Sequence, residues 1–233
     1  MEFSLLSPDG HLFILRWFHF FFGVIWIGHL YYFNFTQVPF FAETDNATKS
    51  NAIQKLVPRA LWWFRWSALV TFVTGLIYLM ARGGQIGEGA WTSSWGVAIL
   101  TGALLGTIMF LNVWLIIWPN QKIVIESTTN VAQGKPANPA AATSGARALV
   151  ASRTNTLFSL PMLFFMGAAS HLNFSITEES NFNLYWIITL AVIGAIELNA
   201  IKGKIGPLAT VKGVIHAGVG LMLVMYGIVE VIL

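Results

Sequence analysis

The chain contains no cysteine among its 233 residues. This absence excludes disulfide bonds, thiolate metal sites, iron–sulfur clusters and a covalently attached c-type haem. Any redox cofactor must therefore be held by histidine or by non-covalent packing.

Charged residues are also scarce. They make up 10% of the chain, against about 25% in a typical soluble domain. Hydrophobic residues make up 56%, and the mean hydropathy is +0.67. This composition predicts a protein that lies in a lipid bilayer.

Six apolar runs approach the length of roughly 20 residues that a membrane-spanning helix requires. They are residues 12–34, 60–81, 94–118, 155–171, 183–201 and 208–231. The segment 119–154 contains the Gly-, Pro- and Ala-rich stretch AQGKPANPAAATSGARA, which is typical of a flexible loop. We therefore expect one all-α membrane domain over residues 1–233, a bundle of about six transmembrane helices with a cytoplasmic loop at 119–154.

The positive charges are distributed unevenly along the chain. Most of the 13 Lys and Arg residues lie in or beside the connections after the first, third and fifth runs: Lys49, Lys55, Arg59, Lys122, Lys135, Arg147, Arg153, Lys202, Lys204 and Lys212. Cytoplasmic loops of membrane proteins carry such an excess. The pattern predicts that both termini face away from the cytoplasm, in a bacterial inner membrane, and it is unlike a nucleic-acid-binding surface.

Four of the five histidines fall within or at the ends of apolar runs: His19, His29, His171 and His216. Ionisable residues are costly inside a membrane, so each is a functional candidate. The alternative for any one of them is a neutral histidine bonded to a neighbouring carbonyl. Four together favour ligands of haem b, and the two readings remain open for each residue.

Small residues accompany some of these histidines on the same helix face, since positions three or four apart are neighbours. Gly23 lies beside His19, while Gly213 and Gly220 lie on either side of His216. Such glycines would let a flat porphyrin approach the helix backbone, although glycine is common in membrane helices anyway.

Depth in the membrane provides a test of which histidines could share an iron. At about 1.5 Å per residue, His29 lies roughly 8 Å and His216 roughly 12 Å from the cytoplasmic ends of their helices. We therefore pair His29 with His216 and, less closely, His19 with His171. Two stacked haems would follow, but a single haem bound by two of the four is left open.

Two more charged residues lie at comparable depth near the cytoplasmic side. Arg65 occurs in WWFRWSALVTF and Glu197 in AIELNAIKGK. A mutual ion pair would explain both. Alternatively, Arg65 holds a haem propionate, because its planar fork suits carboxylates, and Glu197 acts as a base or in a proton path.

Several long stretches resemble the membrane domain of the membrane-bound urate oxidase (urate hydroxylase) family. They are RWFHFFFGVIWIGH, LWWFRWSALVTFVTGL, NVWLIIWPNQK and SRTNTLFSLPMLFFMGAASH. The first run is also similar, more distantly, to the membrane protoporphyrinogen oxidase and copper-resistance D families. The matching stretches contain His19, His29, His171, Arg65 and Arg153. His216 lies outside them and rests only on the arguments from its surroundings and depth.

The resemblance implies a haem-dependent membrane protein that oxidises urate to 5-hydroxyisourate. In that family, electrons pass to a cytochrome c domain fused at the C-terminus. This sequence ends at Leu233 and contains no CxxCH, so we expect a separate periplasmic cytochrome c as the partner.

Three other functions remain open at this stage. The chain could be a haem-carrying or structural subunit of a larger respiratory or photosynthetic complex, a protoporphyrinogen oxidase-like enzyme, or a permease for copper or a small solute. The sequence leaves the oligomeric state undetermined.

Overall fold

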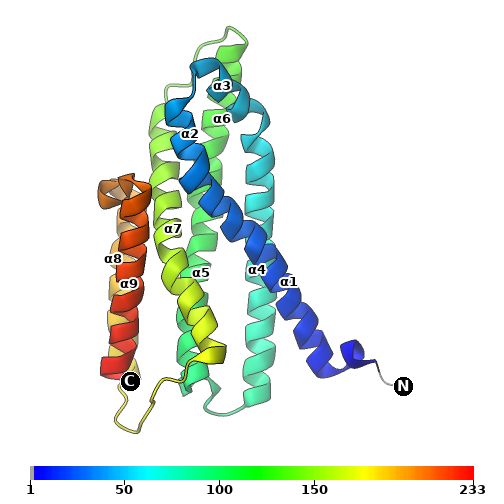
Figure 1. Cartoon of the computed structure of the whole chain (residues 1–233), viewed down its shortest axis with the longest axis vertical. Coiled ribbons are helices and arrows are strands. Elements are labelled where there is room, and N and C mark those ends of the chain that lie inside the picture. The colour runs from blue at the N-terminus through cyan, green and yellow to red at the C-terminus, as the bar shows by residue number, and fades with distance from the viewer. Residues whose placement is uncertain (1–2) are drawn as a thin grey trace.

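The computed structural model of the chain describes residues 3–233. Figure 1 shows a bundle of long helices. In chain order the main helices are α1 (Pro8–Tyr31), α2 (Val38–Glu43), α3 (Asn46–Lys55), α4 (Val57–Ile86), α5 (Ser94–Leu111), α6 (Trp118–Ala132), α7 (Ala141–His171), α8 (Phe182–Lys202) and α9 (Val211–Ile232). Short 3₁₀ turns at Ser4–Leu6, Ala90–Thr92 and Gly206–Ala209 precede α1, α5 and α9. The all-α fold class is confirmed.

Successive long segments of the chain run along the bundle in alternating directions (Figure 1). The segments α1–α2, α5–α6 and α8 run one way, and α4, α7 and α9 return. Both ends of the chain lie at the same end of the bundle, while α2, α3 and α6 extend beyond α8 and α9 at the other end. This arrangement puts the Lys- and Arg-rich connections together, opposite the termini.

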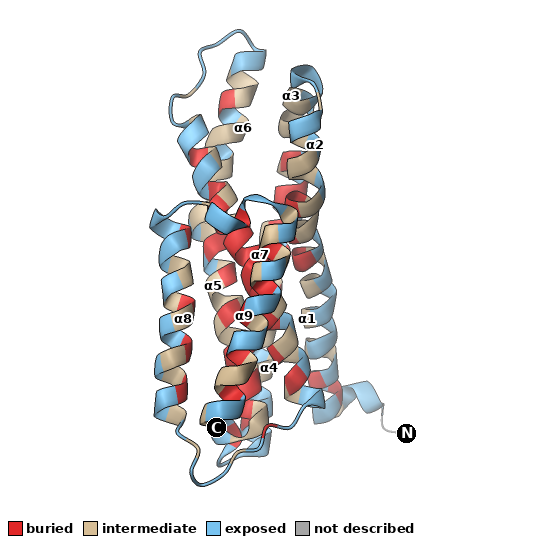
Figure 2. Ribbon diagram, turned by 60° about the vertical axis from the view of Figure 1, so that its left-hand side comes forward, coloured by how far each residue is buried: buried red, intermediate tan, exposed pale blue. Residues whose placement is uncertain are grey.

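Within the described residues, five helical segments are long and apolar enough to cross a membrane: Pro8–Glu43, Val57–Ile86, Ser94–Ala132, Phe182–Lys202 and Val211–Ile232. Their outer faces carry exposed apolar side chains such as Phe20, Val24 and Leu115, and Figure 2 shows long exposed stripes on α1, α8 and α9. These faces suit contact with lipid tails. The chain is a multi-pass membrane protein.

The sixth expected span, 155–171, is part of α7, which is not among those five segments. The reason is its position, because α7 packs against α5, α6, α8, α9 and α1. Most of its neighbours are therefore protein rather than lipid, and polar residues such as Arg153, Thr154 and Asn155 are buried on it. A helix enclosed by other helices does not need a fully apolar surface.

The expectation of a flexible loop over residues 119–154 is wrong for most of that segment. Helix α6 continues to Ala132 and α7 begins at Ala141, which leaves only residues 133–140 between them. The stretch after Ala140 is rich in alanine, a strong helix former, and it packs on α6.

Two of the long helices contain a π-helical segment, Tyr32–Gln37 before α2 and Asn112–Ile117 before α6. Each segment lies just before a proline, Pro39 or Pro119. A proline within a helix lacks an N–H and clashes with the carbonyl four residues earlier, so local widening of the helix accommodates it. Single π turns of this kind are frequent at functional sites.

Candidate functional site

His19 is held between α1 and α4. Its Nδ1 lies 2.9 Å from the carbonyl oxygen of Thr71 on α4. Gly75, one turn further along α4, allows the ring to approach, because a Cβ there would lie 2.7 Å from the ring Cε1 atom. The close packing of the two helices therefore fixes both the position and the orientation of the imidazole.

His29 is fixed within its own helix instead. Its Nδ1 lies 2.7 Å from the carbonyl oxygen of Ile25. A carbonyl oxygen can only accept a hydrogen bond, so Nδ1 carries the proton in both His19 and His29. In the neutral form of each ring, Nε2 then has a free lone pair, which is the usual state of a metal-ligating histidine.

The other two membrane histidines lie on the outside of the bundle. His171 is the last residue of α7 and His216 lies in the first half of α9, and both are exposed. Within residues 3–233, no group of three or more His, Asp or Glu side chains could hold a metal ion. The candidate ligands are therefore separate side chains rather than a preformed cluster.

A contact between α1 and α7 provides a common reference point for the positions of His19 and His171 along these helices. The hydroxyl groups of Tyr31 on α1 and Ser159 on α7 are 2.9 Å apart. His19 lies twelve residues before Tyr31, and His171 lies twelve residues after Ser159. The two helices run in opposite directions, so both histidines lie about 18 Å from that contact, toward the termini. The predicted pair His19 and His171 thus lies equally far along the two helices from that contact.

These positions along the helices do not bring the predicted pairs together, however. The α1–α7 interface is formed near Tyr31 and Asn34, and the N-terminal part of α1 slants away from α7 (Figure 1). His29 and His216 lie on α1 and α9, which are not among the closely packed helix pairs in the described chain. Neither pair shares a helix–helix interface.

The three predicted glycines have different surroundings. A Cβ at Gly23 would lie 3.8 Å from Thr71, so this glycine contributes to the packing of α1 on α4. A Cβ at Gly213 would collide with the backbone carbonyl of Pro207, which explains a glycine in that turn. Gly220 faces open space. The structure gives no common flat surface that these residues share.

Arg65 and Glu197 do not form the ion pair that we considered. The Arg65 guanidinium lies over the Trp118 ring, 3.8 Å from its centroid, in a cation–π contact. Glu197 on α8 accepts a hydrogen bond from Asn112 through its Oε2 atom at 3.0 Å. Each charge is therefore engaged with a different part of the bundle.

Asn112 and Asn155 connect Glu197 to the centre of the bundle, and sequence reasoning missed both. Asn112 Nδ2 also donates to Asn155 Oδ1 at 3.0 Å, and Asn155 Nδ2 donates to the Met109 carbonyl at 2.9 Å. We call Asn112, Asn155 and Glu197 the α5–α7–α8 network. One feature of the sequence could have identified Asn112 as a candidate: it is a lone asparagine in an otherwise apolar run, seven residues before a proline.

Arg153 has the most unusual environment of the predicted residues. Its side chain is only 2% exposed, and its Nε and Nη1 atoms have no hydrogen-bond partner in the described chain. A buried charge is strongly destabilising unless a partner compensates for it. The arrangement can therefore accept an anionic group.

A comparison with known families shows the family to which the chain belongs. The sequence profile described as "Urate oxidase N-terminal" matches residues 87–226, more than half of the chain. The chain belongs to the urate oxidase N-terminal family. No curated protein and no solved structure matches it.

The region that matches the urate oxidase N-terminal family runs from just before α5 into α9. It contains Arg153, His171, Glu197 and His216, together with Asn112 and Asn155 of the α5–α7–α8 network. His19, His29 and Arg65 lie before it. The well-oriented imidazoles are thus outside the matched region, and the buried arginine is inside it.

Proposed function

We propose that this urate oxidase-like membrane protein is a b-type haem oxidoreductase that passes electrons to a cytochrome c. The observation that supports haem is the orientation of His19 and His29, each with Nδ1 bonded to a backbone carbonyl and Nε2 free. Both rings are half-buried rather than enclosed, so a planar group could reach them from the side of α1. Bound haem iron would supply one-electron redox chemistry.

The chain's own residues would bind and orient the other reactants. Arg153 offers unpaired N–H groups to an anion, either a propionate or the urate anion. Glu197 would accept a proton, and Asn112 holds its carboxylate in place. Arg65, already stacked on Trp118, is available to a propionate through the edge of its guanidinium.

The expected electron acceptor is a cytochrome c on the side of the membrane where the termini lie. His19 and His171 are both displaced toward that side from the Tyr31–Ser159 contact. We place the protein in the bacterial inner membrane, with that side facing the periplasm.

The test begins with optical spectra of the detergent-purified chain, oxidised and dithionite-reduced, and a pyridine haemochrome assay. We expect one or two haems b per chain. His19→Ala and His29→Ala should each lower the haem content, because each removes a free Nε2 ligand. The matched control is His11→Ala, since His11 is exposed and precedes the first apolar run.

Unchanged haem content in both membrane variants would contradict their assignment as ligands, and a preparation without haem would contradict the cofactor. Reduction of the haem by urate, but not by protoporphyrinogen, would separate the urate oxidase-like activity from the protoporphyrinogen oxidase-like alternative.

A second candidate function is a haem-carrying subunit of a larger electron-transfer complex. The exposure of His171 and His216 favours it, because a haem on those residues would need a cover from another protein. Native electrophoresis of gently solubilised membranes distinguishes the two. An isolated chain that urate reduces supports the enzyme, whereas stable co-migration with other haem proteins supports the subunit.

A further inference from the structure

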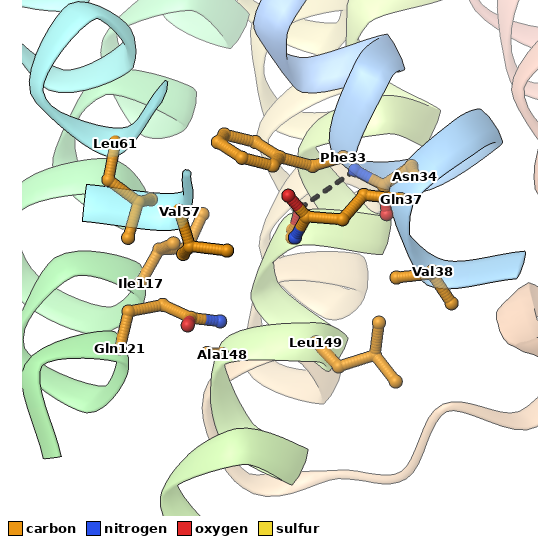
Figure 3. A pocket seen from close by; sticks show the side chains of 11 residues that line it. Phe33, Asn34, Gln37, Val38, Val57, Leu61, Ile117, Gln121, Ala148 and Leu149 are labelled. Carbon is orange, nitrogen blue, oxygen red and sulfur yellow. Dashed lines mark hydrogen bonds between the residues drawn. The ribbon is translucent and has the colours of Figure 1, made fainter. Parts of the chain in front are cut away.

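A small cavity lies at the end of the bundle opposite the termini, where α1 passes into α2. Its volume is about 60 Å³, and its walls come from the first π segment, α4, the second π segment with α6, and α7. Figure 3 shows the amide groups of Gln37 and Gln121 pointing into it and the hydrogen bond between Asn34 and Ser152 at its edge. Polar side chains from three separate segments therefore meet in one space.

Two acceptors in this cavity wall have no donor. Asn34 is 1% exposed, and the Asn34 Oδ1 and Gln37 Oε1 atoms are buried without a hydrogen-bond partner in the described residues. Almost all buried polar atoms in native proteins are hydrogen-bonded to protein or to ordered water. A water molecule needs roughly 10–15 Å³ of such space and two to four polar partners. The cavity meets both requirements for a few waters.

Hydroxyl groups continue from the cavity into the bundle along one face of α7. Ser152, Thr156 and Ser159 are spaced four and three residues apart, so they lie on the same face. Asn34 Nδ2 donates to Ser152 Oγ at 2.8 Å, and Tyr31 contacts Ser159 at 2.9 Å. We call these five residues the α1–α7 polar seam.

The hydroxyls of the seam are locally bonded but can reorient. Thr156 Oγ1 donates to the Ser152 carbonyl at 3.0 Å, and Ser159 Oγ donates to the Thr156 carbonyl at 2.7 Å. A hydroxyl can accept one hydrogen bond while donating another. Among these hydroxyls of the described chain, only those of Tyr31 and Ser159 contact each other, so water entering from the cavity would bridge the others. A chain of hydroxyls and water can pass a proton from one oxygen to the next.

We propose that the cavity holds water and admits protons to the α1–α7 polar seam from the end opposite the termini, as far as Tyr31. The inner end of the seam lies two residues from His29 in sequence. The path would therefore supply protons to the part of the membrane where the proposed electron transfer takes place. It does not itself depend on haem.

The absence of cysteine from the native chain makes single cysteine substitutions clean reporters. The first experiment labels Gln37→Cys in sealed vesicles with a charged, membrane-impermeant methanethiosulfonate, added from either side. The matched control is Leu115→Cys, because Leu115 lies in the second π segment and is 68% exposed on the outer face.

We expect Gln37→Cys to react at least about tenfold faster than Leu115→Cys, because hydrocarbon excludes both the thiolate and the charged reagent. The reaction should occur from the side opposite the termini. Equal rates at the two positions, or reaction from the side of the termini, would overturn the proposal that the cavity is a hydrated entrance.

The second experiment follows the proton directly. In Ser159→Cys, the single S–H group gives an infrared stretching band free of other protein bands, and its exchange to S–D is timed after transfer to D₂O. We expect faster exchange than in Leu115→Cys, and slower exchange when Asn34→Leu is added. Exchange unaffected by Asn34→Leu would contradict a path through the cavity. If Ser159→Cys does not fold, Thr156→Cys on the same seam replaces it.

Discussion

Gly75 lies directly against the His19 ring, and this contact shows how one residue can determine a ligand's position. A Cβ at Gly75 would lie 2.7 Å from Cε1 and 2.9 Å from Nδ1 of His19. The ring cannot simply move aside, because Nδ1 is bonded to the Thr71 carbonyl. We therefore expect Gly75→Ala to displace the imidazole and break that hydrogen bond.

The predicted cost of Gly75→Ala is about 1–3 kcal/mol, the usual range for an added methyl group in a packed interior. Thermal unfolding in detergent measures it, and haem content per chain reports the position of the ring. Gly28→Ala is the control, because Gly28 on α1 faces open space. A stability change in Gly75→Ala no larger than in Gly28→Ala would show that the contact is not tight.

At the residue scale, the hydrogen bonds of the histidines are compatible with two interpretations: a neutral core histidine and a metal ligand. A neutral core histidine and a metal ligand each use Nδ1–H toward a backbone carbonyl, as His19 and His29 do. The two interpretations differ only at Nε2. The haem content of the His19→Ala and His29→Ala variants, rather than their stability, therefore distinguishes the two interpretations.

At the scale of elements, the two π segments place asparagines against α7. Asn34 bonds to Ser152, and Asn112 bonds to Asn155. In both cases the side chain enters the bundle just before the helix meets a proline. The bulged backbone thus supplies the polar contacts by which α1 and α5 are fixed to the central helix.

Asn155→Ala tests this element-level arrangement. The substitution leaves one N–H of the Asn112 side chain without its acceptor. It also removes one of the hydrogen bonds to the Met109 carbonyl, which keeps the backbone N–H of Asn112 as a donor. Each buried unsatisfied group costs about 1–3 kcal/mol. We expect a clear fall in the temperature of unfolding and a change in the environment of Glu197.

The control for that substitution is Asn183→Ala, because Asn183 is exposed at the start of α8. We expect Asn183→Ala to unfold at the same temperature as the unsubstituted protein. An Asn155→Ala protein as stable as Asn183→Ala would mean that water or a backbone shift replaces the lost bonds.

A short repeat relates the returning helices. Near its start, α4 has Arg-Ala-Leu at residues 59–61 and Arg65 six residues after Arg59. In α7, Arg-Ala-Leu at residues 147–149 precedes Arg153 with the same spacing. Yet Arg65 is only half-buried and stacks on Trp118, whereas Arg153 is 2% exposed. The difference follows from packing, since α8 and α9 cover α7 in addition to α5 and α6.

At the scale of the whole molecule, the charge distribution predicts the orientation in the membrane. Lys135 lies in the α6–α7 connection, and Glu178 lies in the α7–α8 connection at the end with the termini; both are exposed. In a chain without native cysteine, Lys135→Cys and Glu178→Cys report the two sides. We expect an impermeant thiol reagent to label Glu178→Cys in intact cells and Lys135→Cys only after the membrane is opened.

Each variant is the control for the other, since both replace an exposed charged residue in a loop. Labelling of Lys135→Cys but not Glu178→Cys in intact cells would show that the orientation is the opposite of the predicted one. The termini would then face the cytoplasm, away from the proposed periplasmic cytochrome c. Labelling of both would indicate leaky cells, which a cytoplasmic marker enzyme detects.

The sequence alone determined the all-α class and the approximate positions of five helical segments that are long and apolar enough to cross a membrane. It did not determine where they end, because α2 continues to Glu43 and α6 to Ala132. Long apolar runs must satisfy their backbone hydrogen bonds within helices when they lie in lipid, so these elements follow from local composition. The resemblance to the urate oxidase family is confirmed by the profile match over residues 87–226. The role of Arg153 in cofactor binding stays a prediction. The expected loop at 119–154 failed because local Gly and Pro content says little about the packing that extends α6 and α7.

Only the tertiary structure decided how the polar residues are partnered. The sequence predicted that Arg65 and Glu197 lie at one depth. It did not predict that they contact different residues, Trp118 and Asn112. It gave no sign that Gly75 accommodates His19, or that Asn34, Ser152 and Ser159 line one seam. Depth follows from counting residues along a helix, whereas lateral position depends on which helices pack together. That choice is made by contacts between residues far apart in the chain.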